Sequence, residues 1–131
     1  MEPIHFTLEL TGNAVEVERG RLWLETSAAD GTASCRRRVE LWDDGTVLEV
    51  GELSFGPDDA VTFRARGSLG ASPDRQRRHG TAVLEVTGGR GRLAGARGYV
   101  TSNYLLSETG AVTDHHLGLL FAPGWRETPT R

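Results

Sequence analysis

Apolar and polar residues alternate along almost the whole chain, and this period of two constrains the fold more than any other feature. Between Ile4 and Leu10, apolar side chains are separated by His5, Thr7 and Glu9. Successive side chains of a strand point to opposite faces, so this segment is predicted to be a half-buried β-strand. No segment longer than a turn or two has helical spacing. The chain is therefore predicted to be all-β.

The same alternation predicts about eight strands separated by turn signals. The clearest turn is Asp43-Asp44-Gly45, because Asp and Gly tolerate the positive φ of tight hairpins. The segment Ser68 to His79 breaks the alternation with Gly, Ser, Pro and arginine, and is predicted to be an exposed loop. The expected strands cover approximately residues 4–10, 20–26, 33–42, 46–55, 60–67, 80–87, 99–106 and 112–121.

Eight short strands joined by hairpins imply an antiparallel up-and-down meander. Closing the meander into a barrel removes both edge strands, which otherwise pair with neighbouring molecules. About eight strands enclose an interior just wide enough for side chains or one small ligand. A two-sheet sandwich would show the same alternation and is the alternative. The prediction is one all-β barrel domain over residues 1–131, with an irregular tail from about residue 122.

Charge and cysteine content argue against several classes of function. The net charge is −3 and every basic residue is arginine, so no overall positive field exists to attract nucleic acid. No apolar run approaches the roughly 20 residues of a membrane span, and no secretion signal is recognisable. Cys35 is the only cysteine, which fits a reducing cytoplasm. Because no zinc spacing, P-loop or Ser-His-Asp order occurs, neither metal nor cofactor is predicted.

Two segments resemble the allene oxide cyclase and dirigent barrel superfamily. The glycine-rich run from Val86 to Gly98 is similar to a hairpin of those proteins, although Arg90 stands where Thr or Ser is usual. Trp42-Asp43-Asp44-Gly45-Thr46, followed by Val50-Gly51, resembles their middle hairpin. The resemblance extends from about Leu41 to Leu106 and implies a calycin-like barrel of the allene oxide cyclase type.

Members of that superfamily guide the cyclisation or coupling of reactive, largely apolar intermediates. Some small bacterial barrels of this shape catalyse Diels–Alder type (4+2) cyclisation of polyketides. The resemblance therefore implies a cofactor-free cyclase, or isomerase, for a polyketide-type intermediate in natural-product biosynthesis. Such an enzyme needs a shaped apolar cavity that confines its substrate and one or two hydrogen-bond donors near a carbonyl. The rival hypothesis is a non-catalytic dirigent-like or lipocalin-like binding protein.

Three polar residues are the candidate catalytic groups. One of the two histidines His115 and His116 must face inward, and His115 is preferred because its face carries Leu117, Leu119 and Phe121, whereas His116 shares its face with Asp114, Gly118 and Leu120. A core histidine bonded to a backbone carbonyl is the alternative to a functional donor. Tyr104 could donate to a substrate carbonyl, or could tie its hydroxyl to the barrel rim, and Asn103 is its rival if the other face is inside. Glu49 is either a buried carboxylate with a raised pKa or a surface acid paired with an arginine. The expected substrate-binding residues are Phe6, Leu8, Leu22, Leu24, Phe63, Ser102, Leu117, Leu119 and Phe121.

Two further features concern the surface. Trp23 alternates with Arg21 and Glu25, so it is expected on the outer face, where it suggests a homodimer contact. The run Arg36-Arg37-Arg38 is expected to belong to a solvated strand. The cyclase hypothesis requires a closed barrel whose interior is not packed solid with leucine and phenylalanine.

Overall fold

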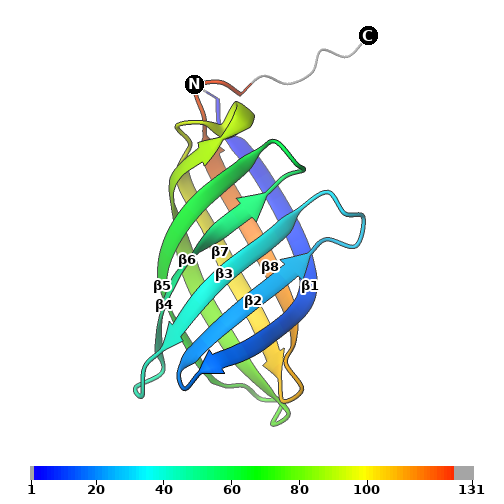
Figure 1. Cartoon of the computed structure of the whole chain (residues 1–131), viewed down its shortest axis with the longest axis vertical. Coiled ribbons are helices and arrows are strands. Elements are labelled where there is room, and N and C mark those ends of the chain that lie inside the picture. The colour runs from blue at the N-terminus through cyan, green and yellow to red at the C-terminus, as the bar shows by residue number, and fades with distance from the viewer. Residues whose placement is uncertain (1, 126–131) are drawn as a thin grey trace.

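The alternating segments pair in sequence order into a closed antiparallel barrel in the computed structural model, which describes residues 2–125. Every strand pairs with the next one along the chain, and β1 pairs with β8 to close the cylinder (Figure 1). The elements are β1 (Ile4–Glu18), β2 (Arg21–Ser27), β3 (Ser34–Leu41), β4 (Thr46–Ser54), β5 (Ala60–Ala71), β6 (Arg77–Arg90), the 3-10 helix η1 (Gly91–Leu93), β7 (Arg97–Ser107) and β8 (Ala111–Phe121).

Closure confirms the barrel and excludes the sandwich. The β1–β8 ladder runs from the pair Ile4↔Leu120 to the pair Asn13↔Ala111, so neither strand is left as an edge. The predicted Asp43-Asp44-Gly45 turn joins β3 to β4, with Gly45 at φ +88°. In the described part of the chain, no helix has the length and apolar character that crossing a membrane requires.

The hairpin between β5 and β6 is longer than the sequence pattern predicts. Ser68 pairs with Thr81 and Ala71 pairs with Arg78, so most of the expected loop from residue 68 to residue 79 is strand. The turn itself is confined to residues 72–76. Ser72 holds it by donating to the backbone oxygens of both Asp74 and Arg77. Polar composition favours a loop locally, but the ladder to the neighbouring strand overrides that preference.

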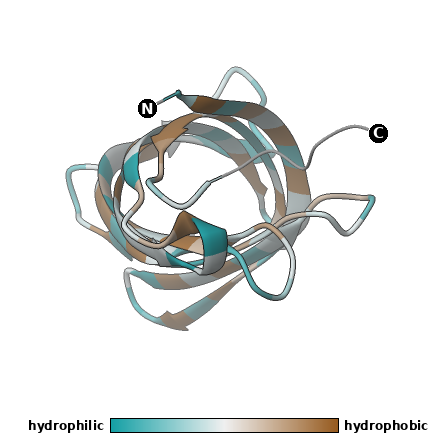
Figure 2. Ribbon diagram, turned by 90° about the horizontal axis from the view of Figure 1, so that it is seen from above, coloured by the Kyte–Doolittle hydropathy of each residue, from teal (hydrophilic) through white to brown (hydrophobic). Residues whose placement is uncertain are grey.

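Two apolar clusters fill the two ends of the barrel interior. Figure 2 views the barrel from the end that carries η1. The cluster at this end, called the η1-end cluster, contains Leu10, Ala33, Cys35, Leu53, Val61, Phe63, Ala82, Leu84, Val86, Leu93, Ala96, Val100, Leu120 and Ala122. The far-end cluster contains Leu22, Leu24, Val39, Val47, Leu69, Tyr104, Leu106 and Val112.

Interior aromatic rings lie over glycines of the neighbouring strand. A Cβ built on Gly80 would come 2.0 Å from the ring of Tyr104, and one on Gly118 would come 2.1 Å from the ring of Phe6. Both are cross-strand pairs of the barrel. The missing side chains therefore make the space in which these two rings lie, an arrangement that pins strand register in curved sheets.

The glycine-rich run forms the cover of one barrel end. Leu93 of η1 and Ala96 are buried in the η1-end cluster. Asp59 holds the segment in place, because its carboxylate accepts hydrogen bonds from the backbone N–H, the Nε and the Nη2 of Arg92. The Arg92 guanidinium also lies 4.4 Å from the ring centroid of Trp125. The run therefore has a structural role in covering this end of the barrel.

Candidate functional site

A buried arginine crosses the barrel between the two apolar clusters. Arg37 is on β3, and its Nη2 donates to Ser102 Oγ on β7 at 3.1 Å and to Asp114 Oδ2 on β8 at 2.8 Å. Its guanidinium also lies 4.8 Å from the ring centroid of Tyr104. Since β3 and β7 lie on opposite sides of an eight-stranded ring, the Arg37 side chain spans the bore. It divides the interior into two apolar halves.

Asp114 is the main anionic partner of this arginine. Its Oδ1 accepts from Ser102 Oγ at 2.8 Å, and its Oδ2 accepts from both Arg37 and His116 Nε2, the latter at 2.8 Å. Burial acts to raise the pKa of the Asp114 carboxyl, but the bond from His116 and the charge of Arg37 outweigh it, so the pKa is lowered. Asp114 is therefore an ionised carboxylate at neutral pH.

Glu49 is in a different electrostatic situation, although it also faces Arg37. Its Oε1 lies 3.3 Å from Arg37 Nη1, and both side chains are almost completely enclosed. Burial raises the pKa of the Glu49 carboxyl, and the charge of Arg37 offsets this only in part. Burial likewise raises the pKa of Tyr104. Two carboxyl groups that share one arginine thus have pKa values moved in opposite directions, a pattern common in acid–base sites.

Five buried polar atoms of this layer have no hydrogen-bond partner among residues 2–125. They are Arg37 Nη1, Glu49 Oε1, Glu49 Oε2, Tyr104 Oη and His116 Nδ1. Buried polar groups in native proteins are nearly always hydrogen-bonded, and each exception needs an explanation. The four side chains come from β3, β4, β7 and β8, and they meet in one place. We call Arg37, Glu49, Ser102, Tyr104, Asp114 and His116 the polar layer.

The structure places one group of predicted site residues on the wrong face. His115, Leu117, Leu119 and Phe121 point outward from β8, and Leu117 is 61% exposed. The expectation that the bulkier face of this strand is buried was wrong. The inner face instead carries Gly118, whose missing side chain leaves room for an aromatic ring from β1. The inner-facing histidine is therefore the neighbouring residue, His116.

The other predicted residues face the interior. Tyr104 and Glu49 are buried in the polar layer, so the reading of Glu49 as a surface acid is excluded, and Asn103 is exposed. Their catalytic role stays a prediction. Phe6 and Leu8 are half-buried against the η1-end cluster, which also contains Phe63. The remaining inward-facing residues of the predicted set are Leu22, Leu24 and Ser102.

Sequence reasoning missed Arg37 as an interior residue, and it preferred His115 to the face that carries Asp114 and His116. The signal for Arg37 was available, since period two puts it on the face of Cys35 and Val39, but the surrounding arginines suggested solvent. The signal for the other two lies in the β7–β8 hairpin. Tyr104 pairs with Asp114, and directly paired residues share a face of the sheet.

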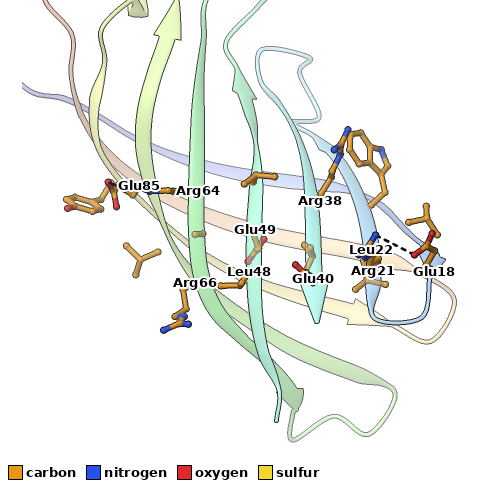
Figure 3. Close-up of a pocket in the computed structure, with 17 residues that line it drawn as sticks. Glu18, Arg21, Leu22, Arg38, Glu40, Leu48, Glu49, Arg64, Arg66 and Glu85 are labelled. Atoms are coloured by element: carbon orange, nitrogen blue, oxygen red, sulfur yellow. Dashed lines mark hydrogen bonds and ion pairs between the residues drawn. The ribbon is translucent and has the colours of Figure 1, made fainter. Parts of the chain in front are cut away.

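The outer face of the barrel carries a large open groove. It has a volume of about 1120 Å³ and is bordered mainly by outward-facing side chains of β2 to β7 (Figure 3). The apolar lining includes Val17, Trp23, Val50, Val83 and Tyr99, and the charged lining includes Glu18, Arg21, Arg38, Glu40, Arg64, Arg66 and Glu85. Glu49 borders the groove only from behind, because its side chain is enclosed on the inner side.

Comparison with known proteins supports the fold. No protein-family model matches the chain, and no curated protein matches it significantly. Among solved structures, it is similar to the pterocarpan synthase dirigent protein GePTS1, with a TM-score of 0.68 and 13% sequence identity. The match covers 92% of this chain and 88% of that chain. At this identity the likeness shows the fold alone, and it confirms the expected eight-stranded antiparallel barrel.

Proposed function

We propose that the barrel binds a small, mostly apolar molecule by one polar group and promotes its intramolecular ring closure without a cofactor. The observation that carries the proposal is the set of buried polar atoms that have no hydrogen-bond partner among residues 2–125, in the middle of an otherwise apolar interior. Among them, Arg37 Nη1 and Glu49 Oε1 form an ion pair at 3.3 Å without a hydrogen bond. Leaving a buried polar group unpaired costs about 1–3 kcal/mol. A ligand that supplies the missing partners recovers this free energy on binding.

The unpartnered atoms favour a carbonyl oxygen as the polar group of the ligand. Arg37 Nη1 can only donate, and the Tyr104 hydroxyl can donate. Glu49 can donate as well when protonated, which its raised pKa favours. Three donors around one oxygen resemble the arrangement that stabilises developing negative charge in enzymes. Drawing electron density toward that oxygen activates a conjugated carbonyl for ring closure.

The apolar clusters supply the rest of the binding site. The η1-end cluster includes half-buried members, among them Phe6, Leu8, Phe55 and Trp125, whereas the half-buried members of the far-end cluster are Ala14 and Leu41. Because these large apolar side chains at the η1 end are partly exposed to solvent, the proposed entrance is at that end. A ligand would displace or push aside these side chains and place its polar group at Arg37.

Confinement is the catalytic principle under this proposal. Holding the reacting ends of a flexible chain together removes much of the entropic barrier to cyclisation. A polyketide-type chain combines an apolar body with carbonyl groups, and it therefore suits both parts of the interior. The Diels–Alder type reaction rests on the sequence resemblance, and the polar layer supplies the activation that such a reaction can use.

The alternative is a dirigent-like or lipocalin-like protein that binds the same molecule without converting it. Incubating the purified chain with linear polyketide-type dienes that carry a conjugated ketone separates the two. Ring closure faster than the spontaneous rate supports the cyclase. Saturable binding with no rate increase supports the binding protein, and no binding at all contradicts both.

Tyr104→Phe is the sharpest variant for this test. It keeps the ring against Gly80 and beneath Arg37 but removes a hydroxyl that has no partner among residues 2–125. We expect unchanged or increased stability in urea, together with weaker ligand binding or slower ring closure. Exposed Tyr99→Phe is the matched control, with no effect expected on either quantity.

We also propose that the outer groove is where two copies of the chain meet. Val17, Val50, Val83 and Tyr99 are each more than half exposed there. Arginine and glutamate side chains both line the same groove, so one copy presents both charge signs to another. A two-fold interface requires such self-complementarity, since the same patch meets itself. Trp23, the predicted dimer contact, also borders this groove.

A further inference from the structure

The hydrogen bond between Asp114 and His116 determines which nitrogen of the imidazole carries a proton. Asp114 Oδ2 lies 2.8 Å from His116 Nε2, and an ionised carboxylate can only accept hydrogen bonds. Nε2 must therefore be the N–H. In the neutral ring the other nitrogen, Nδ1, then has a free lone pair. This nitrogen is buried and has no partner among the described residues.

We propose that His116 Nδ1 is a base that removes a proton from the carbon next to a bound carbonyl group, with Asp114 as its positioning residue. The inference deepens the proposed function and rests on it, because it needs a carbonyl compound in the polar layer. It assigns a second activity, the interconversion of ketone and enol forms. A cyclase that can form an enol would also prepare its own substrate for ring closure.

The geometry brings the base and the donors to the same small region. Arg37 and His116 both contact Asp114 Oδ2, at 2.8 Å each, so the guanidinium and the imidazole are neighbours. Tyr104 lies against the same guanidinium, and Glu49 approaches its Nη1. We expect a carbonyl group bound at this guanidinium to lie in the same polar layer as the imidazole, because Arg37 and His116 share Asp114 Oδ2. Base and donors on either side of one reacting group are the features expected of a proton-transfer site.

Each step conserves atoms and electrons. The C–H bond breaks, its electron pair forms the new C=C bond, and the carbonyl π pair moves onto the oxygen. The proton goes to His116 Nδ1, while Arg37 and Tyr104 donate to the oxygen as its charge develops. His116 then returns the proton to the oxygen, or to a carbon, and no oxidant or cofactor is needed. Asp114 stabilises the transient imidazolium without itself taking the proton.

The hydrogen bond from Nε2 to Asp114 fixes the orientation of the His116 ring, while Nδ1 keeps no hydrogen-bond partner among residues 2–125. A buried ring nitrogen without a partner is the feature that a purely structural network leaves unexplained. Positioned bases of this kind contribute about 10²–10⁴-fold to rate.

The first test reads the protonation of the imidazole in the free protein and needs no ligand. Nitrogen-15 NMR of the histidine rings at pH 7.5 distinguishes the two neutral forms from the charged form. We expect the neutral ring of His116 to carry its proton on Nε2, the atom that bonds to Asp114. In Asp114→Asn this preference should be lost, which tests Asp114 as the group that orients the ring, whereas the role as a base is tested by the proton exchange described next. A proton on Nδ1 in the wild-type protein would overturn the proposal.

The second test measures proton abstraction directly with α-tetralone, a small apolar ketone, in D₂O. Binding is followed by saturation-transfer NMR, and exchange by the loss of the proton signal of the carbon next to the carbonyl. We expect accelerated exchange in the wild-type protein, a loss of about 10²-fold or more in His116→Asn, and no change in His115→Asn, whose side chain is outside the barrel.

The outcomes separate the two proposals. Binding with accelerated exchange that depends on His116 supports both. Binding with exchange no faster than in buffer overturns the role of His116 and leaves ligand binding intact. Failure of α-tetralone to bind contradicts the proposed function, and the proton-transfer inference is rejected with it. If His116→Asn does not fold, exchange no faster than in buffer, or a proton on Nδ1 in the wild-type chain, still overturns the role of His116.

Discussion

Arg37 Nη2 on β3 lies 2.8 Å from Asp114 Oδ2 on β8, and both side chains are almost fully enclosed. The two strands are not neighbours in the barrel wall, so this ion pair joins separate parts of the cylinder through its interior. Removing two charges from water is costly, and an apolar pair of the same volume would often be as stable. The interior thus retains a costly arrangement where apolar packing would be the simpler solution, and that favours a functional role for the polar layer.

Asp114→Asn should destabilise the protein strongly. The substitution leaves the Arg37 charge buried without its closest anion, and loss of one partner of a buried pair typically costs about 3–5 kcal/mol. Asp74→Asn is the matched control, because Asp74 forms a pair of similar length, 2.7 Å, with Arg77 on the exposed hairpin. Surface pairs contribute about 0–1 kcal/mol. Urea unfolding of both variants checks the contrast, and equal losses would contradict the assignment of the buried pair.

Glu49 should make the barrel less stable as pH rises. Its pKa in the folded state is raised above 4.5, so just above that pH the unfolded chain releases a proton that the folded chain keeps. Unfolding is favoured by this release, and the free energy of unfolding falls by about 1.4 kcal/mol per pKa unit of the shift. The loss begins near pH 4.5 and ends at the raised pKa.

Glu49→Gln isolates that effect, since glutamine does not titrate. We expect the variant and the wild type to differ little at pH 4, and the variant to become the more stable of the two as pH rises to 8. Denaturation curves at each pH give the difference. A wild-type protein that gains stability relative to the variant over this range would show that Glu49 is ionised in the fold. Asp114 does not affect this comparison, because its lowered pKa changes the free energy of unfolding only below about pH 3.8.

Most of the fold could be predicted from local sequence because period-two alternation and hairpin turns are local signals. One exception is β1, which runs to Glu18 although the pattern predicts its end near residue 10. Another is the β5–β6 hairpin, where Ser68 and Gly70 have weak strand preference. Both residues pair with β6, at Thr81 and His79. The alternation within a single segment does not indicate which other segment it pairs with. The closed barrel was predicted because closure removes edge strands, and no particular residue indicated it.

The polar layer could be predicted only in part, because a charged side chain is buried only where the fold brings a group of opposite charge next to it. Arg37 has its anions 77 residues away at Asp114 and on the next strand at Glu49. No single segment contains that information. The inner face of β8 was misassigned for a related reason. Bulk suggested that Leu117 is inside, whereas the register with β7 puts His116 there.

Gly80→Ala should displace the Tyr104 ring and destabilise the protein. An added Cβ would meet the Tyr104 ring at 2.0 Å, so the ring must move away from its place beneath Arg37. Overpacking of this kind typically costs about 1–3 kcal/mol. Gly70→Ala is the control on the partner strand, where an added Cβ meets nothing within 4 Å. Thermal unfolding of the two variants measures the difference, and similar melting temperatures would contradict the close packing of ring and glycine.

Val50→Asp should prevent self-association through the outer groove. Val50 is 54% exposed, and its cross-strand neighbours are Arg38 and Arg64. An aspartate there can pair with either arginine in the free chain, so the fold should tolerate it. In a two-fold interface the same aspartate would be buried close to its own copy or would break the arginine–glutamate pairs between chains. Leu117→Asp, on β8 and outside the groove lining, is the control.

Sedimentation velocity of the wild-type chain should give a dimer that Val50→Asp dissociates and Leu117→Asp does not. A monomeric wild-type chain, or a dimer lost only with Leu117→Asp, would mean that the groove is not the contact between copies.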